Sequence, residues 1–252
     1  MNPSTEGHTL GVDLGSSYVK AVLLDEGGRI VRSGLRPTGY DYREAVEALL
    51  PGFPAEVPRV GLTGYGRKQV LEGVRKTEIS CLAKALLHEG VRDATVVDIG
   101  GQDCKLLRIE GGRLASHHLN RRCAAGTGSY LEFMAYRLGL DCGEMTRLSA
   151  QTRECRSLNS YCTVFASTEI LDCLRRRVPL PQLVRGMYAS IAERVGEMAP
   201  LEPPLYLAGG VVAHHPAVTE IFSAVHAVDV HEAPRPQFLA AQGAALYARD
   251  AT

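Results

Sequence analysis

The sequence predicts an α/β protein in which one structural unit occurs twice. Apolar runs typical of strands alternate along the chain with amphipathic runs typical of helices. A strand, a glycine turn and a returning strand at residues 9–25 are repeated from Ala94 onward, about eighty-five positions later. We therefore expect two lobes, residues 1–93 and 94–252, with the last helix as a candidate for return to the first lobe.

Glycine and proline bound the elements of the first half. The dipeptide Gly27-Gly28 turns the second strand back, and prolines at positions 51 and 54 end a helix. The expected strands are residues 9–15, 18–25, 29–35 and 60–63, and the expected helices are residues 41–50 and 79–89.

The second half begins with the repeated hairpin and continues with longer helices. The first of these helices is expected to start directly after Cys123, with Gly126, Thr127 and Gly128 in its first turn. The expected strands are residues 94–99, 105–109 and 205–208, and the expected helices are residues 124–138, 163–174, 183–198 and 238–249.

Composition narrows the functional classes. Lys and Arg together number 28, as do Asp and Glu, so there is no basic footprint for nucleic acid or for an anionic membrane. No apolar run approaches the ~20 residues of a membrane helix, and the first residues lack an apolar signal region. We therefore expect a cytoplasmic protein, in which seven cysteines indicate thiols or metal ligands before disulfides.

The first glycine turn has the residues of a phosphate site. Asp13 ends a strand, Gly15 allows close approach of the backbone, and Ser16 and Ser17 offer hydroxyl and amide donors. Asp13 is suited to hold a water of Mg²⁺, and Lys20 to offset phosphate charge. A plain strand turn has a similar pattern, so the motif gains weight only through its repetition.

That repetition occurs at Asp98, Gly100 and Gly101, which are followed by Gln102 and Asp103. Two such turns can hold the β- and γ-phosphates of ATP from opposite sides. Gln102 or Asp103 would then position the attacking water.

A third turn, Gly209-Gly210, follows the buried run at 205–208 and offers bare backbone to an adenine ring. In order, the three turns resemble the phosphate-1, phosphate-2 and adenosine motifs of the actin, sugar-kinase and heat-shock-chaperone superfamily. The resemblance implies a duplicated, ribonuclease-H-like, two-lobed ATPase. It also adds Gln237, in the closing segment 236–245, to the nucleotide-binding residues.

Within that superfamily the chain resembles the ATP-dependent activators of 2-hydroxyacyl-CoA dehydratases and the related ATPase subunits of benzoyl-CoA reductase. Two strings carry the resemblance, Asn120-Arg-Arg-Cys123-Ala-Ala-Gly-Thr-Gly and Tyr161-Cys162-Thr-Val-Phe-Ala166. They are similar to the cluster-ligand segments of that family. The resemblance implies that Cys123 and Cys162 hold one 4Fe-4S cluster at the interface of a homodimer, since two subunits together supply the four thiolates.

The resemblance also implies a reaction. An electron from ferredoxin or flavodoxin would pass through the cluster to a partner of the 2-hydroxyacyl-CoA dehydratase or benzoyl-CoA reductase type. ATP would bind with Mg²⁺ between the lobes, and lobe closure would swing the helix after Cys123. The positive end of that helix would stabilise the thiolate and the reduced cluster.

The remaining cysteines lie outside the two strings and are interpreted as structural, with Cys155 as the candidate for a spare thiol. They are Cys81, Cys104, Cys142, Cys155 and Cys173.

Two features depart from the family pattern. Ser167-Thr168 precede Glu169 where the family usually has a glutamate directly, which concerns the surroundings of the cluster. His214-His215 stand where a polar residue such as Asn is more familiar, which concerns nucleotide affinity. We interpret the histidines as a solvent-exposed loop, because adjacent residues rarely converge on one metal ion.

Two alternatives remain at this point. A small-molecule kinase of the amino-sugar type would explain the three turns equally well, with Asp103 as the base towards a substrate hydroxyl. A nucleotide-dependent sensor would bind ATP with negligible turnover and contain no iron. Neither alternative accounts for the strings around Cys123 and Cys162.

Overall fold

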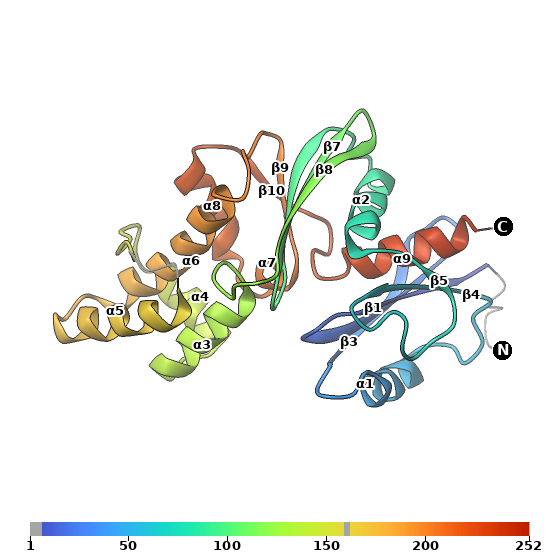
Figure 1. Cartoon of the computed structure of the whole chain (residues 1–252), viewed down its shortest axis with the longest axis horizontal. Coiled ribbons are helices and arrows are strands. Elements are labelled where there is room, and N and C mark those ends of the chain that lie inside the picture. Colours follow the sequence, from blue (N-terminus) through green and yellow to red (C-terminus); the bar gives the residue numbers. More distant parts are fainter. Residues whose placement is uncertain (1–6, 159–161, 252) are drawn as a thin grey trace. The chain divides into compact units, whose positions relative to one another are not determined.

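The computed structural model describes residues 7–158 and 162–251 and divides the chain into two compact units (Figure 1). Unit 1 consists of Met1–Arg92, Gly112–Leu114 and Phe238–Thr252, and unit 2 consists of Asp93–Gly111 and Ala115–Gln237. The described part of each unit contains a five-stranded mixed sheet packed with helices. The predicted α/β fold class with an internal duplication is thereby confirmed.

The elements of unit 1 are β1 (Thr9–Leu14), β2 (Tyr18–Leu24), β3 (Ile30–Pro37), α1 (Tyr42–Leu49), the 3₁₀ turn Leu50–Gly52, β4 (Arg59–Gly64), β5 (Val74–Arg75), α2 (Glu78–His88) and α9 (Leu239–Arg249). The strand order is β3-β2-β1-β4-β5. The central strand β1 pairs antiparallel with β2 and parallel with β4. The first glycine turn connects the carboxyl end of β1 to β2.

Different helices cover the two faces of this sheet, and the strands alternate accordingly. On β2, Val19, Ala21 and Leu23 pack in one cluster with residues of α1. Val22 and Leu24 point to the opposite face and pack with α9. The alternation of side chains along the strand therefore decides which helix each residue of the hairpin contacts. The glycine turn itself lies at the end of the sheet.

Helix α9 approaches the sheet so closely that glycine is required at the contact. A Cβ atom added to Gly11 would lie 2.0 Å from the carbonyl oxygen of Ala241. At Gly61 it would lie 1.9 Å from the carbonyl oxygen of Ala244. The last helix of the chain therefore supports β1 two residues before Asp13.

The elements of unit 2 are β6 (Ala94–Ile99), β7 (Cys104–Glu110), β8 (Arg113–Asn120), α3 (Gly128–Leu138), α4 (Cys142–Ser149), α5 (Thr163–Arg175), α6 (Leu180–Gly196), β9 (Leu205–Ala208), α7 (Gly210–His214), α8 (Ala217–His226) and β10 (Val230–Glu232). The first two residues of β8 fall in unit 1. The strand order, read from β8, is β8-β7-β6-β9-β10. Strand β6 pairs antiparallel with β7 and parallel with β9, which repeats the relations of β1 in unit 1.

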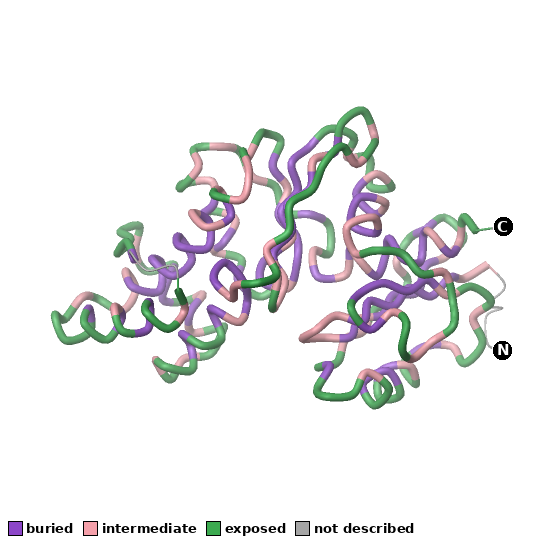
Figure 2. Tube along the Cα trace, in the orientation of Figure 1, coloured by how far each residue is buried: buried purple, intermediate pink, exposed green. Residues whose placement is uncertain are grey.

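Helix α6 is the centre of the unit 2 core. Figure 2 shows α6 buried along much of its length, whereas β8 is exposed along most of its length. Val184, Met187 and Ile191 of α6 belong to one apolar cluster with residues of β6, β7, β9, α3, α4, α5 and α8. The helices that follow the second glycine turn are thus anchored to a common core.

The structure corrects the expected start of α3 and adds elements that were not predicted. Helix α3 begins at Gly128, whereas the sequence suggested a start at Ala124. The segment 124–127 instead forms a turn, in which the Thr127 N–H donates to the Ala124 carbonyl at 3.1 Å. The unpredicted elements are β5, β8, β10, α4, α7 and α8. Most of them are short or, like β8, largely polar and exposed, so they lack a long apolar period. Helix α8 is an exception, because its ten residues bury an apolar face of Val218, Ile221 and Phe222.

None of the described helices is both long and apolar enough to cross a bilayer.

Candidate functional site

The first glycine turn, between β1 and β2, is built around an ion pair. Asp13 and Lys20 are direct cross-strand partners, and Lys20 Nζ lies 2.8 Å from Asp13 Oδ2. The other carboxylate oxygen, Asp13 Oδ1, is buried and has no hydrogen-bond partner among the described residues. A buried oxygen of this kind requires a partner, and a magnesium ion or one of its waters is a chemically suitable one.

The turn is held from the end of β3 by a residue that the sequence motif does not include. The Thr38 hydroxyl donates to the Gly15 carbonyl at 2.8 Å, and the Thr38 N–H donates to the Ser17 carbonyl at 3.0 Å. Because a trans peptide directs its carbonyl and its N–H to opposite sides, the Ser16 N–H points away from Thr38. The local motif gives no signal for Thr38, which lies 23 residues from Gly15 along the chain.

The second glycine turn, between β6 and β7, repeats the ion pair of the first. Asp98 and Lys105 are cross-strand partners, and Lys105 Nζ lies 3.2 Å from Asp98 Oδ2. Both residues lie eighty-five positions after their counterparts, Asp13 and Lys20. The register of the hairpin thus places one lysine beside one aspartate in each unit.

Lys105 also binds the carboxylate of Asp103, with Nζ 2.7 Å from Oδ1. The turn is closed by the Gly100 N–H, which donates to the Asp103 carbonyl at 2.9 Å. Gln102 is exposed at the tip between them. Of the two predicted catalytic residues, Gln102 is therefore the more accessible to a water molecule.

The start of α3 holds the second turn from behind. The Gly128 N–H donates to the Gly100 carbonyl at 2.9 Å, and the Ser129 N–H donates to the Gly101 carbonyl at 2.8 Å. The Ser129 hydroxyl donates to the same Gly101 oxygen at 2.7 Å. By the geometry of the trans peptide, the N–H groups of Gly101 and Gln102 point away from α3, where an anion can bind them.

The third glycine turn lies against the second one within unit 2. Gly209 has a φ of 98°, and a Cβ atom there would lie 2.3 Å from the Ile99 carbonyl oxygen at the end of β6. Gln237 is buried, with its Nε2 atom 3.6 Å from the position of a Cβ on Gly210. The structure therefore brings Gly209, Gly210 and Gln237 together near the end of the strand that carries Asp98. The missing Cβ of Gly209 allows this packing against β6, whereas the backbone at Gly210 is open enough to face a flat ring.

The two cysteines of the resemblance lie at the surface of unit 2. Cys123 is half-buried in the loop between β8 and α3. The Asn120 side-chain amide is within 3.4 Å of the Cys123 carbonyl oxygen and 3.3 Å of the Ala125 carbonyl oxygen, which supports that loop. Cys162 is exposed at the N-cap of α5, and its carbonyl accepts from the Ala166 N–H at 2.8 Å.

Helix polarity acts on these cysteines differently from the prediction. The first N–H groups of α3 bind the carbonyls of Gly100 and Gly101, so they serve the glycine turn rather than Cys123. Cys162, in contrast, directly precedes the first turn of α5, so it lies beside the positive end of a helix. Tyr161, which precedes Cys162 in the second string, lies outside the described residues.

Cys123 and Cys162 together could supply two of the thiolates of an iron–sulfur cluster. Within the described residues there is no group of three or more His, Cys, Asp or Glu side chains that could hold a metal ion. Four thiolates are the usual ligand set of a 4Fe-4S cluster, so a single copy lacks part of that set.

The other cysteines fall into two groups. Cys81, Cys104 and Cys173 are buried, and burial raises the pKa of Cys81 to about 12 and also raises that of Cys104. Cys142 and Cys155 are exposed, and partial desolvation followed by nearby carboxylates raises the pKa of each. Cys155 is thus an accessible thiol, as proposed from its sequence context.

The interpretation of His214-His215 as a solvent-exposed loop is wrong for His215. His214 is exposed at the end of α7, but His215 is buried and its Nδ1 lies 2.8 Å from the Tyr188 hydroxyl oxygen. Burial, and secondarily the neighbouring His214, lowers the pKa of His215 to about 4. His215 is therefore a neutral core residue that connects α7 to α6.

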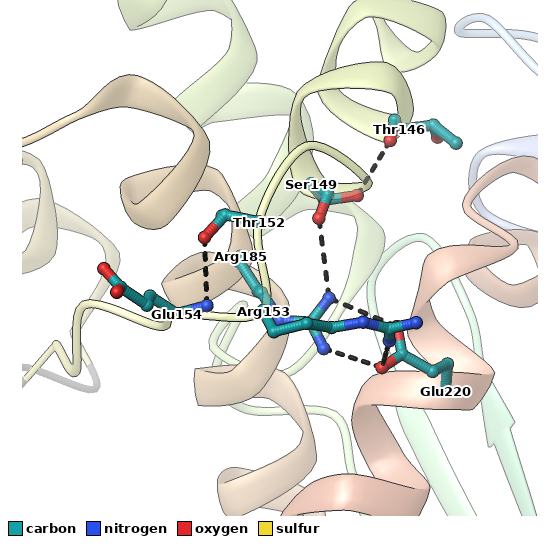
Figure 3. A network of polar contacts seen from close by, with 7 residues as sticks. All are labelled: Thr146, Ser149, Thr152, Arg153, Glu154, Arg185 and Glu220. Atoms are coloured by element: carbon teal, nitrogen blue, oxygen red, sulfur yellow. Dashed lines mark hydrogen bonds and ion pairs between the residues drawn. The ribbon is translucent and has the colours of Figure 1, made fainter.

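A buried arginine joins the end of α4 to α6 and α8. Figure 3 shows the Arg185 guanidinium directed at the Ser149 carbonyl and at the Glu220 carboxylate, to which Nη2 is 2.7 Å from Oε1. Arg153 also pairs with Glu220, and the Ser149 hydroxyl donates to the Thr146 carbonyl. Hydrogen bonding from Arg185 lowers the pKa of Glu220, so the network holds a carboxylate in its charged form.

Comparisons with known proteins match nearly the whole chain. The sequence model of the BadF/BadG/BcrA/BcrD ATPase family matches residues 10–248. An activator of lactoyl-CoA dehydratase from Anaerotignum propionicum is 35% identical over 255 residues, which cover 97% of this chain and 98% of that protein.

Solved structures match over similar lengths. The activator of 2-hydroxyisocaproyl-CoA dehydratase from Clostridium difficile, determined with bound ADPNP, has a TM-score of 0.87 and 31% identity, covering 96% of this chain and 94% of that one. A ROK family glucokinase from Streptomyces griseus has a TM-score of 0.57 at 17% identity, covering 96% and 98%, and shows a shared fold alone. The expected actin and sugar-kinase type of fold is confirmed.

Proposed function

Because this chain belongs to the BadF/BadG/BcrA/BcrD ATPase family, we propose that it is an ATP-hydrolysing activator that passes a low-potential electron to a partner enzyme. The observation that carries the proposal is the position of Cys123 and Cys162. Both are accessible in the unit that contains the second glycine turn, and both stand within the strings that resemble cluster-ligand segments. Cys142 and Cys155 are also exposed but lie outside those strings.

ATP and Mg²⁺ are the proposed ligands of the glycine turns. Asp13, through its unpartnered Oδ1, would hold the magnesium ion or its water, and Lys20 would offset phosphate charge. Gly15, Ser16 and Ser17 would bind phosphate from the first turn. Asp98, Gly100, Gly101 and Gln102 would do so from the second turn. Gly209, Gly210 and Gln237 would bind the adenosine.

Hydrolysis requires an oriented water molecule. Gln102, exposed at the tip of its turn, is proposed to hold that water, with Asp103 shaping the turn through its bond to Lys105. The transfer of the phosphoryl group to water then yields ADP and phosphate.

A second copy of this chain is the proposed dimer partner. Cys123 and Cys162 with the same pair from the second copy would supply the four thiolates for a 4Fe-4S cluster, which provides one-electron chemistry. Val164 and Phe165, two and three residues after Cys162, are both 66% exposed. Large apolar side chains at the surface are typical of an interface, so they support pairing on this side of α5.

The electron donor and acceptor are proposed from the relatives. A reduced ferredoxin or flavodoxin would give up one electron, and a 2-hydroxyacyl-CoA dehydratase or benzoyl-CoA reductase type partner would accept it. The activator of Anaerotignum propionicum acts on lactoyl-CoA dehydratase, which makes the dehydratase class the first to test.

The kinase alternative receives less support. It does not account for the two strings around Cys123 and Cys162, and the ROK family glucokinase that shares the fold is only 17% identical to this chain. The sensor alternative differs from the proposal in two measurable properties: it predicts negligible ATP hydrolysis and no iron.

The test is an anaerobic purification with iron and sulfide analysis and a visible spectrum. We expect about four irons per dimer, lost in Cys123→Ala and in Cys162→Ala. Cys142→Ala is the matched control, because Cys142 is also exposed and lies outside both strings. A colourless wild-type protein that still hydrolyses ATP would overturn the proposal.

A further inference from the structure

The loop that bears Cys123 is bonded to the first turn of α3 and through it to the second glycine turn. The fully buried Thr127 donates its hydroxyl to the Ala124 carbonyl at 2.5 Å, directly after Cys123. Two residues after Thr127, Ser129 donates both its N–H and its hydroxyl to the Gly101 carbonyl. Only five positions separate Cys123 from the first residue of α3.

Helix α3 packs tightly against the second glycine turn. A Cβ atom on Gly128 would lie 3.2 Å from Gly101 Cα and 3.4 Å from the Gly100 carbonyl oxygen. Close-packed elements of this kind move together or change partners, because they cannot deform gradually.

The geometry of one peptide unit provides the link. The Gly101 carbonyl and the Gln102 N–H belong to the same rigid plane and point in opposite directions. A phosphate oxygen bound by the Gln102 N–H would hold this peptide plane in one orientation, and with it the Gly101 carbonyl to which Ser129 is bonded. Without the phosphate, only the Ser129 bonds would hold the plane.

From these contacts we infer that Ser129 is a positioning residue that transmits the state of the nucleotide from the Gly100–Asp103 turn to the loop bearing Cys123. The inference rests on the proposed function, since it takes this turn to bind ATP. The backbone bonds of Gly128 and Ser129 form whatever the side chain is. The hydroxyl is the part of the link that depends on residue type.

The experiment measures the alkylation rate of Cys123 in the full-length, iron-free chain, with each cysteine resolved by peptide mass spectrometry. The rate is compared without nucleotide, with MgADP and with a magnesium complex of a non-hydrolysable ATP analogue. Cys142, which is exposed and outside the loop, serves as the internal reference.

We expect the ATP analogue to change the Cys123 rate in the wild type and Ser129→Ala to reduce that change by about three- to tenfold, the effect of one neutral hydrogen bond. Ser129→Thr retains a hydroxyl and should restore the response. Ser223→Ala is the matched control, because the Ser223 hydroxyl donates to the Val228 carbonyl at the same distance of 2.7 Å elsewhere in unit 2.

Nucleotide binding is measured on the same samples by calorimetry. A wild type that binds the analogue without any change at Cys123, or a Ser129→Ala variant that responds like the wild type, would overturn the inference and leave the proposed function standing. A wild type that binds no nucleotide would overturn both.

Discussion

His215 Nδ1 lies 2.8 Å from the hydroxyl oxygen of Tyr188, and both side chains are buried in unit 2. Burial lowers the pKa of His215 to about 4. In an unfolded chain a histidine has a pKa of about 6.5. The folded protein therefore excludes a proton that the unfolded chain accepts.

This difference predicts acid sensitivity. The stability that His215 contributes is complete above pH ~6.5 and is lost as the pH falls towards 4, by up to about 3 kcal/mol. His215→Gln keeps an acceptor for Tyr188 and does not titrate, so its free energy of unfolding should fall less between pH 7 and pH 4.5. Urea unfolding at the two pH values measures this. His118→Gln, at an exposed position of β8, should behave like the wild type.

Asp13→Asn is expected to reduce magnesium-dependent ATP hydrolysis by about 10- to 100-fold, the usual cost of altering a metal-site carboxylate. The amide keeps the size of the side chain but removes the charge that would face Mg²⁺ and Lys20. Steady-state hydrolysis over a range of Mg²⁺ concentrations gives the result. Asp229→Asn, at a side chain that is 81% exposed, is the control. Equal rates for both variants would contradict a role for Asp13.

Gly61→Ala is expected to destabilise unit 1 by about 3 kcal/mol or more, because overpacking against backbone has no flexible side chain to relieve it. The added Cβ atom would lie 1.9 Å from the Ala244 carbonyl oxygen of α9. Gly52→Ala adds the same methyl group where nothing lies within 4 Å, so its effect should be small. Denaturant unfolding compares the two; similar values would show that α9 does not pack on β4 as described.

The thiols of the iron-free chain should react in three groups. Cys142, Cys155 and Cys162 are exposed and should be alkylated first, followed by the half-buried Cys123. Three thiols are buried and should react only after unfolding: Cys81, Cys104 and Cys173. Time-resolved mass spectrometry at pH 8 measures the order. Early reaction of Cys81, whose pKa burial raises to about 12, would contradict its placement under α9.

Local sequence was sufficient to locate both glycine turns that we propose to bind phosphate. An antiparallel hairpin with a short glycine turn places Asp13 beside Lys20 through register alone, and the same spacing recurs at Asp98 and Lys105. The family strings around the two surface cysteines are also local, so the family could be assigned before the fold was known. The long apolar periods of α6 and α9 were found for the same reason.

Tertiary packing decided what supports these turns. Thr38 reaches the first turn across 23 residues and Ser129 reaches the second across 28, and no local pattern signals such contacts. Helix α3 begins at Gly128, four residues later than predicted, and its first N–H groups donate to carbonyls of the second turn. His215 is buried because Tyr188 provides a hydrogen bond in the core. Hydrogen bonds between distant segments depend on how the elements pack, so only the folded structure reveals them.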